Sequence, residues 1–124
     1  MRVFVVEDSP IVQERLVEML NEIEGVDVVG AADNADAAVA DILRLLPDVA
    51  VLDIKLRAGS GLAVLEQIRR KAPGMTTIML TNYAGAEHRQ RCLGAGADYF
   101  FDKTDEFERV KGALQELLAA GTSP

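Results

Sequence analysis

The sequence has few of the residues from which disulfides, zinc sites and membrane spans are built. Its 124 residues include one cysteine, Cys92, which excludes an internal disulfide, and one histidine, His88, which gives little support to a metal role. No apolar run approaches the roughly 20 residues that a membrane span needs. Glu7 and Asp8 close the first apolar run, a layout unlike that of a signal peptide. We therefore expect a cytoplasmic protein.

Basic charge is also scarce. Lys and Arg number 13 against 20 Asp and Glu, so the formal net charge is −7. Nucleic-acid backbones and anionic membranes are bound through surplus basic charge, so neither is expected as a direct partner. The length, with 49% apolar and 27% charged residues, predicts one globular domain. We expect this domain over residues 1–120, with a short C-terminal tail, 121–124, that leaves no room for a separate output domain.

Short apolar segments alternate along the chain with helical patterns, which is typical of an α/β fold with a parallel sheet. Strands are predicted at 3–6, 28–29, 49–52, 77–80 and 99–101, and helices at 10–24, 34–46, 60–72, 85–95 and after 104–106. Asp105 and Glu106 would complement the dipole of the last helix, which buries Phe107. The fourth helix has little to bury beyond Cys92 and is expected to be the most mobile. Five such repeats predict a flavodoxin-like, doubly wound five-stranded sheet in the order 2-1-3-4-5, with five helices.

Polar residues follow four of the predicted strands. Glu7 and Asp8 come after the first strand, Asp53 after the third, Thr81 closes the fourth, and Lys103 comes just after the fifth. Ligands of open α/β sheets bind outside the carboxyl ends of the strands, where the strand order reverses. The three carboxylates are therefore expected to meet at the switch point between strands one and three.

Three neighbouring carboxylates repel one another, so a cation is expected among them. Lys103 supplies one positive charge. The donor set is all oxygen, which favours a hard ion, Mg²⁺ or Mn²⁺, over Zn²⁺. A metal, a lysine and the Thr81 hydroxyl around a carboxylate suit phosphoryl transfer, with Asp53 as the nucleophile. Taken singly, Asp8 could be a turn former and Lys103 a solvated lysine, but five suitable residues at four strand ends argue for a site.

These residues make the chain similar to the receiver domains of bacterial two-component response regulators (CheY-like) over nearly its whole length. The acidic pair of the family matches Glu7 and Asp8, and its phosphoacceptor matches Asp53 in Val-Ala-Val-Leu-Asp. Its hydroxyl matches Thr81 in Ile-Met-Leu-Thr, and its lysine matches Lys103 in Tyr-Phe-Phe-Asp-Lys.

The resemblance implies a phosphorylation-dependent signalling module that assists its own phosphoryl transfer and dephosphorylation and is not otherwise an enzyme. Asp8, Asp53 and the backbone carbonyl of Lys55 would hold Mg²⁺, with Glu7 acting through water. Thr81 and Lys103 would bind phosphoryl oxygens. Thr81, moving inward, would draw the switch aromatic, here Phe100, into the space that it leaves.

The implied partners are a sensor histidine kinase or a histidine phosphotransferase, which supplies the phosphoryl group, and a downstream protein target. The target would read a changed surface on the fourth helix, fifth strand and last helix, and the resemblance leaves room for a homodimer on phosphorylation. Ile11, off the apolar stripe of the first helix, is a candidate kinase contact. Arg57 and Thr104 stand where the family commonly has proline, so the two loops that contain them differ from the usual pattern.

Two other functions use a similar fold. A haloacid-dehalogenase-like phosphatase also has a strand-end aspartate nucleophile, but it needs a second acid two residues later, where this chain has Lys55. A flavin-binding protein needs a phosphate-cradling loop after the first strand, where Glu7 and Asp8 would repel the phosphate.

Overall fold

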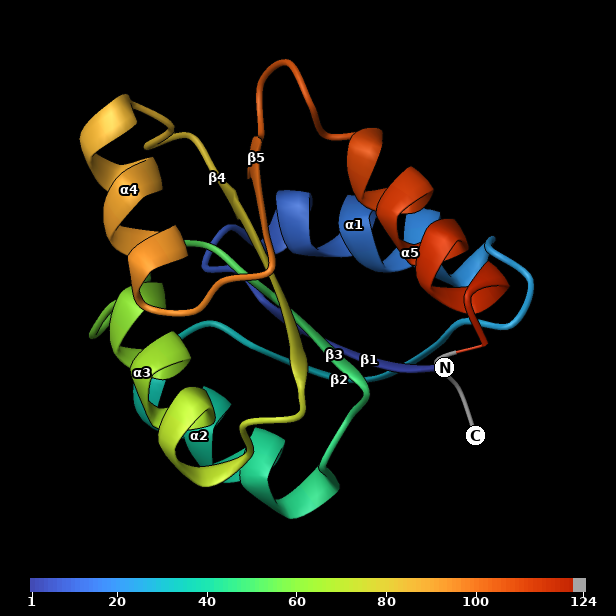
Figure 1. The fold of residues 1–124 in the computed structure, drawn as a ribbon, viewed down its shortest axis with the longest axis horizontal. Helices are drawn as coiled ribbons and strands as arrows, with labels where there is room; N and C mark the ends of the chain where they lie inside the picture. The colour runs from blue at the N-terminus through green and yellow to red at the C-terminus, as the bar shows by residue number, and fades with distance from the viewer. Residues whose placement is uncertain (122–124) are drawn as a thin grey trace.

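The computed structural model describes residues 1–121, in which five strands alternate with five helices (Figure 1). The strands are β1 (Arg2–Val6), β2 (Asp27–Ala32), β3 (Val49–Leu52), β4 (Thr76–Thr81) and β5 (Tyr99–Asp102). The helices are α1 (Pro10–Asn21), α2 (Ala35–Leu45), α3 (Gly61–Lys71), α4 (Ala86–Gly94) and α5 (Arg109–Ala119). All neighbouring strands pair in parallel in the order β2-β1-β3-β4-β5, which confirms the predicted fold class.

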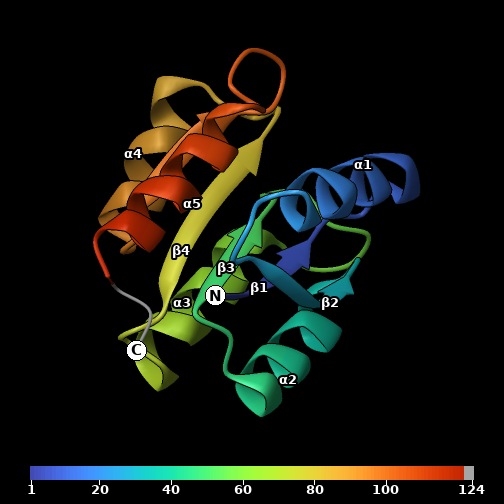
Figure 2. The same cartoon turned by 90° about the vertical axis from the view of Figure 1, so that its right-hand side faces the viewer.

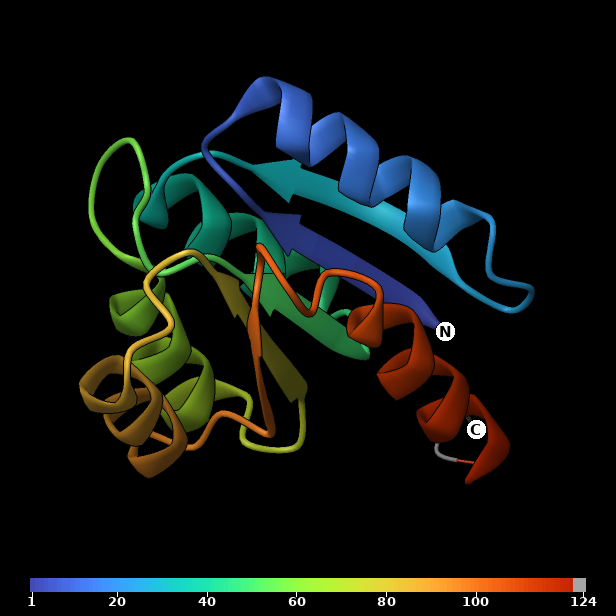
Figure 3. The same cartoon turned by 90° about the horizontal axis from the view of Figure 1, so that it is seen from above.

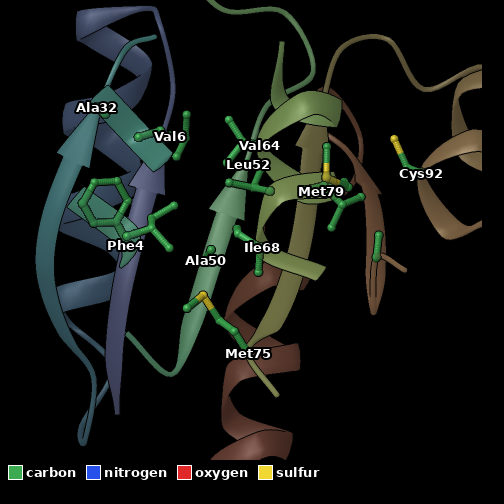
Figure 4. Packing of buried hydrophobic residues seen from close by; sticks show 14 of the residues in the cluster. Phe4, Val6, Ala32, Ala50, Leu52, Val64, Ile68, Met75, Met79 and Cys92 are labelled. Atoms are coloured by element: carbon green, nitrogen blue, oxygen red, sulfur yellow. The ribbon is translucent and has the colours of Figure 1, made fainter. Parts of the chain in front are cut away.

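Helices cover both faces of the sheet because alternate side chains of each buried strand point to opposite faces. Val3 and Val5 of β1 pack toward α1 and α5, whereas Phe4 and Val6 pack toward α2, α3 and α4. Figures 1 and 2 show this division of the helices between the two faces. In Figure 4, Leu52, Val64 and other core side chains fill the space between the sheet and α3. These two cores hold the central strands rigidly, so the strand ends are fixed in space.

The first three helices begin where local sequence predicts. Ser9 Oγ accepts a hydrogen bond from Val12 N at 3.4 Å, with Pro10 as the first residue of α1. Asn34 Oδ1 accepts from Ala37 N at 2.9 Å at the start of α2. At the start of α3, Ser60 Oγ accepts from Ala63 N at 3.2 Å. These side chains satisfy amide groups that a helix start otherwise leaves unpaired.

The start of α5 differs from the prediction. The helix begins at Arg109, so Phe107 lies before it and the acids at 105–106 are not in its first turn. Glu106 instead folds back: its Oε1 accepts from Asp102 N at 2.9 Å and its Oε2 from Arg109 at 2.6 Å. Because that turn pairs its polar groups locally, the chain between 102 and 108 does not join the helix.

Other boundaries agree more closely. β2 is longer than the predicted 28–29, because pairing with β1 extends it through Gly30, Ala31 and Ala32, which have little strand preference of their own.

The helix predicted to bury little is α4, in which Cys92 alone is buried. Apart from Gly121, the predicted tail at 121–124 lies outside the described residues. Within residues 1–121, no helix combines the length and the apolar character that crossing a membrane would take.

Candidate functional site

Three carboxylates meet at the carboxyl ends of β1 and β3. Glu7 and Asp8 directly follow β1, and Asp53 directly follows β3, which pairs with β1. One oxygen of each side chain lies within 4.8 Å of the others, as predicted for the switch point. In Figure 3 the arrowheads of β1 and β2 point to this same edge of the sheet. Glu7 and Asp53 are buried and Asp8 is half-buried.

Lys103 directly follows β5, the edge strand of the sheet, and its side chain reaches the acidic cluster. Its ammonium donates to Glu7 Oε1 at 2.5 Å and to Asp53 Oδ2 at 2.6 Å, and its side chain is 10% exposed. Its backbone N donates to Thr81 O at 2.9 Å, which continues the β4–β5 pairing by one residue. The chain thus places one fixed positive charge between two buried negative charges.

Burial and pairing act against each other on these groups. Burial raises the pKa of Glu7, although hydrogen bonds from Lys103 and from the Ser9 amide lower it in part. Burial by itself lowers the pKa of Lys103, but hydrogen bonds to Asp53 and Glu7 outweigh it, so the pKa of Lys103 is raised. Lys103 therefore stays protonated near neutral pH and neutralises part of the acidic cluster.

The second oxygen of Asp53, Oδ1, is buried and accepts no hydrogen bond. A buried carboxylate oxygen without a partner costs free energy and is rare in folded proteins, so it indicates a group that a ligand completes. Together with Asp8 it offers a hard cation an all-oxygen donor set. The residues present thus fit Mg²⁺ or Mn²⁺.

Gly61 was not among the residues expected at the site, yet it sets the position of Asp53. Its amide donates to Ile54 O at 2.7 Å at the start of α3. A Cβ at this position would fall 1.8 Å from the backbone oxygen of Asp53, so only glycine lets the helix approach so closely. The sequence holds one signal for this, the Ser60-Gly61 pair at a predicted helix start.

Thr81 and Phe100 are both buried. Thr81 Oγ1 accepts a hydrogen bond from Tyr83 N at 3.1 Å, which leaves the hydroxyl hydrogen free to donate. The Phe100 ring packs in the core, with the Arg89 guanidinium 5.6 Å from its centroid. Phe100 already occupies the interior in this conformation, so any motion toward Thr81 starts from a buried ring.

The loop after β5 contains Thr104 at the position where the family commonly has proline. The peptide bond before Thr104 is trans. Thr104 N donates to Asp102 Oδ1 at 2.8 Å, and the hydroxyl of Thr104 bonds to Asn82 Oδ1 at 3.3 Å. These contacts tie the loop after β5 to the loop after β4.

Four other residues were singled out from the sequence. Ile11 is 73% exposed at the start of α1, and Cys92 is buried, which raises the pKa of its thiol. Lys55 is exposed, with its ammonium 5.9 Å from the centroid of the Tyr83 ring. His88 is half-buried and packs edge-on against the same ring, with 6.0 Å between the ring centroids.

Known proteins are similar to this chain in sequence. The family profile described as "Response regulator receiver domain" matches residues 3–115. The chain is 35% identical over 127 residues to a protein-glutamate methylesterase/protein-glutamine glutaminase of Alkalilimnicola ehrlichii. This match covers 96% of the chain and 32% of that protein. It is 38% identical over 116 residues to TcrX, a probable transcriptional regulatory protein of Mycobacterium tuberculosis, covering 94% of the chain and 49% of that protein.

A solved structure agrees with these sequence matches. The response regulator domain of Thermotoga maritima CheB is similar with a TM-score of 0.83 and 29% identity, over 97% of this chain and 94% of that chain. The chain spans about a third and about half of the two curated relatives, respectively.

Proposed function

This chain belongs to the response regulator receiver domain family, whose members act in phosphorylation-dependent signalling, and from that premise we propose that Asp53 is its phosphoacceptor. The observation that carries the proposal is the asymmetry of the Asp53 carboxylate. Lys103 holds Oδ2, while Oδ1 is buried and has no partner. One oxygen is thus oriented and the other is free to form a bond.

The reaction is a phosphoryl transfer from a phosphohistidine. Asp53 Oδ1 attacks phosphorus, a new O–P bond forms, and the P–N bond to the donor imidazole breaks, with its electron pair remaining on the ring nitrogen. Negative charge accumulates on the phosphoryl oxygens as they approach the carboxylates. Lys103 and the free hydroxyl hydrogen of Thr81 supply positive charge and a hydrogen bond to those oxygens.

A divalent cation completes the site in this proposal. Asp8, Asp53 and the backbone carbonyl of Lys55 would hold Mg²⁺, or Mn²⁺ in its place. When bound, the ion neutralises charge on the phosphoryl oxygens. Both oxygens of Glu7 already accept hydrogen bonds, from Lys103 and from Ser9 N at 2.9 Å, which supports contact through water for this residue.

Thr81 and Phe100 would transmit phosphorylation to the surface of α4, β5 and α5. A Thr81 hydroxyl that turns toward a phosphoryl oxygen changes its hydrogen bond with Tyr83 N, at the beginning of the segment that leads into α4. α4 buries little, so a small change at its start costs little free energy to accommodate. Movement of Phe100 within the core would couple β5 to the same change.

Family membership supports a cytoplasmic location for this protein, with a sensor histidine kinase or a histidine phosphotransferase as donor and a protein as target. The target would read the surface of α4, β5 and α5, as a monomer or as a homodimer formed on phosphorylation. The chain itself would act on no substrate other than its own phosphoryl group. The phosphatase alternative finds no support, since the position of its second acid is Lys55.

Intact mass measurement tests the phosphoacceptor. With Mg²⁺ and acetyl phosphate, wild type should gain one alkali-labile phosphoryl group, and Asp53→Asn, which keeps the shape and removes the nucleophile, should gain none. Equal phosphorylation of the variant would reject the assignment of Asp53.

Hydrogen exchange tests the coupling. Thr81→Ala should still accept the phosphoryl group but lose most of the exchange change that phosphorylation produces over residues 83–95. A change of full size in this variant would show that Thr81 is not the link.

A further inference from the structure

The loop between β3 and α3, residues 54–60, is docked on the loop that precedes α2. Arg57 makes two contacts with Asp33: its Nε lies 3.2 Å from Asp33 Oδ2, and its backbone N donates to Asp33 O at 3.1 Å. One residue further on, Ala58 O accepts from Ala35 N at 2.9 Å. Side chain and backbone therefore join the two loops at three points.

The docking partner, Asp33, is itself held by hydrogen bonds. Asp33 Oδ1 accepts from the Asn34 side chain at 2.9 Å, and Asn34 in turn caps α2 through Ala37 N. The loops approach so closely that a Cβ on Gly59, whose φ is +77°, would lie 2.5 Å from Ala35 Cβ. The carboxylate that Arg57 contacts is thus held by the start of a helix whose inner face is buried in the core.

The other side of the loop is tied to the phosphoacceptor. Lys55 and Ser60 form an antiparallel bridge, and Gly61 N donates to Ile54 O at 2.7 Å. These contacts close residues 54–61 into a compact turn that begins at the backbone of Asp53. A shift where the turn meets the α2 loop therefore passes to the backbone of residues 53–55.

We propose that Arg57 is a positioning residue, which holds the backbone of residues 53–55 ready for Mg²⁺ and the phosphoryl group by pairing with Asp33. The inference rests on the proposed function. An ion pair and a backbone hydrogen bond to a neighbouring loop here restrict a turn that proline commonly restricts in the family. The loop also has an apolar anchor, Leu56, which is buried, so loss of the Arg57 side chain loosens the turn without unfolding it.

The size of the effect follows from exposure. The side chains of Arg57 and Asp33 are 67% and 38% exposed, and exposed ion pairs contribute at most about 1 kcal/mol, which is about fivefold in an equilibrium. Arg57→Ala should therefore raise the Mg²⁺ concentration for half-maximal phosphorylation by about three- to fivefold. The effect should shrink in high salt.

A matched control exists on α2. Arg44 and Asp41 form an ion pair at 3.3 Å with nearly equal exposure, 68% and 40%, but it touches neither loop. Arg44→Ala should leave the Mg²⁺ dependence unchanged. Arg57→Lys, which keeps the charge, should restore most of the wild-type dependence.

The experiment measures two quantities for wild type and the three variants. The first is the phosphorylation rate with acetyl phosphate as a function of Mg²⁺, and the second is hydrogen exchange over residues 54–60 in chelator, without donor. Arg57→Ala should require more Mg²⁺, reach a similar rate at saturation and exchange faster over 54–60. A general loss of stability would instead speed exchange throughout the chain and leave the Mg²⁺ dependence unchanged.

Two results overturn the inference. In the first, Arg57→Ala has the same Mg²⁺ dependence and the same hydrogen exchange as wild type. In the second, Arg57→Ala and Arg44→Ala change these quantities equally. Failure of the proposed function looks different, because wild type itself would then take up no phosphoryl group on Asp53. In that case faster exchange over 54–60 in Arg57→Ala alone would still show the docking, and unchanged exchange would refute it.

Discussion

Asp8→Asn should stabilise the metal-free protein, although it removes a residue proposed to bind metal. Asp8 brings a third negative charge to within 4.8 Å of the carboxylate oxygens of Glu7 and Asp53. Lys103 bonds to those two carboxylates, and the structure gives it no bond to Asp8. Asparagine keeps the shape of the side chain and removes its charge, so part of the repulsion in the folded protein disappears.

The magnitude follows from the charges around Asp8. At about 4.8 Å and an effective dielectric of about 20, each unit-charge pair contributes about 3 kcal/mol. Glu7 and Asp53 each repel Asp8, and Lys103 attracts it. The net repulsion on Asp8 is therefore about that of one charge pair. Because Asp8 is half-buried, solvent screening reduces this to roughly 1–2 kcal/mol, or a rise in Tm of about 5 °C for a chain of this length.

Mg²⁺ should reduce or reverse the difference in stability between the two proteins. At five times its Kd, an ion stabilises the folded protein by about 1 kcal/mol, and the gain grows with the logarithm of its concentration. Wild type should show this gain, while Asp8→Asn, which lacks one ligand, should lose most of it. The difference between the two melting temperatures should therefore shrink or change sign as Mg²⁺ is added.

Thermal melts of wild type and of Asp8→Asn, each in chelator and in Mg²⁺, give the four melting temperatures. Glu24→Gln is the control, since Glu24 is exposed in the loop before β2, at the opposite edge of the sheet, and its loss changes the net charge equally. It should shift neither the Tm in chelator nor the gain from Mg²⁺ appreciably. A lower Tm for Asp8→Asn in chelator, together with a full gain from Mg²⁺, would show that Asp8 is only a turn or cap residue.

Three further predictions concern other contacts. Lys103→Met should lower the free energy of unfolding in chelator by about 3–5 kcal/mol, measured in urea, because it leaves two buried carboxylates without a cation. Gly61→Ala should destabilise the protein and slow phosphorylation of Asp53, because its Cβ meets backbone, whereas Gly112→Ala, in open space on α5, should stabilise by about 0.5–1 kcal/mol. The pKa of Glu106 is lowered by hydrogen bonds from the Asp102 amide and from Arg109, so the carboxylate stabilises the fold above its unfolded pKa, and the stability difference from Glu106→Gln should shrink as the pH falls below 4.5 and through the folded-state pKa.

Each of these has a clear contrary result. Lys103→Met as stable as wild type in chelator would mean that the buried carboxylates are protonated or solvated. Equal effects of the two glycine substitutions would show that α3 can move away from Asp53 without loss. For Glu106, the neighbouring Glu108, whose side chain makes no cap hydrogen bond, provides the control. A stability difference for Glu106→Gln that stays unchanged however far the pH falls below 4.5 would exclude its carboxylate as the cause.

The sheet and the residues gathered at its edge could be predicted because they depend on local patterns. Apolar runs such as Val49–Leu52 mark buried strands, and Ser9, Asn34 and Ser60 begin helices through bonds to amides three residues away. Once the strand order is known, a residue directly after a strand has a known place. Asp53 could be placed at the site for this reason, without knowledge of any distant contact.

The details that give the site its chemistry come from the tertiary structure alone. Lys103 reaches carboxylates 96 and 50 residues away, and only the packed sheet decides that it holds one oxygen of Asp53 and leaves the other free. The pairing of Arg57 with Asp33 is of the same kind. Both depend on side chains that are far apart in the chain and are brought together by the fold, so local sequence patterns do not predict them.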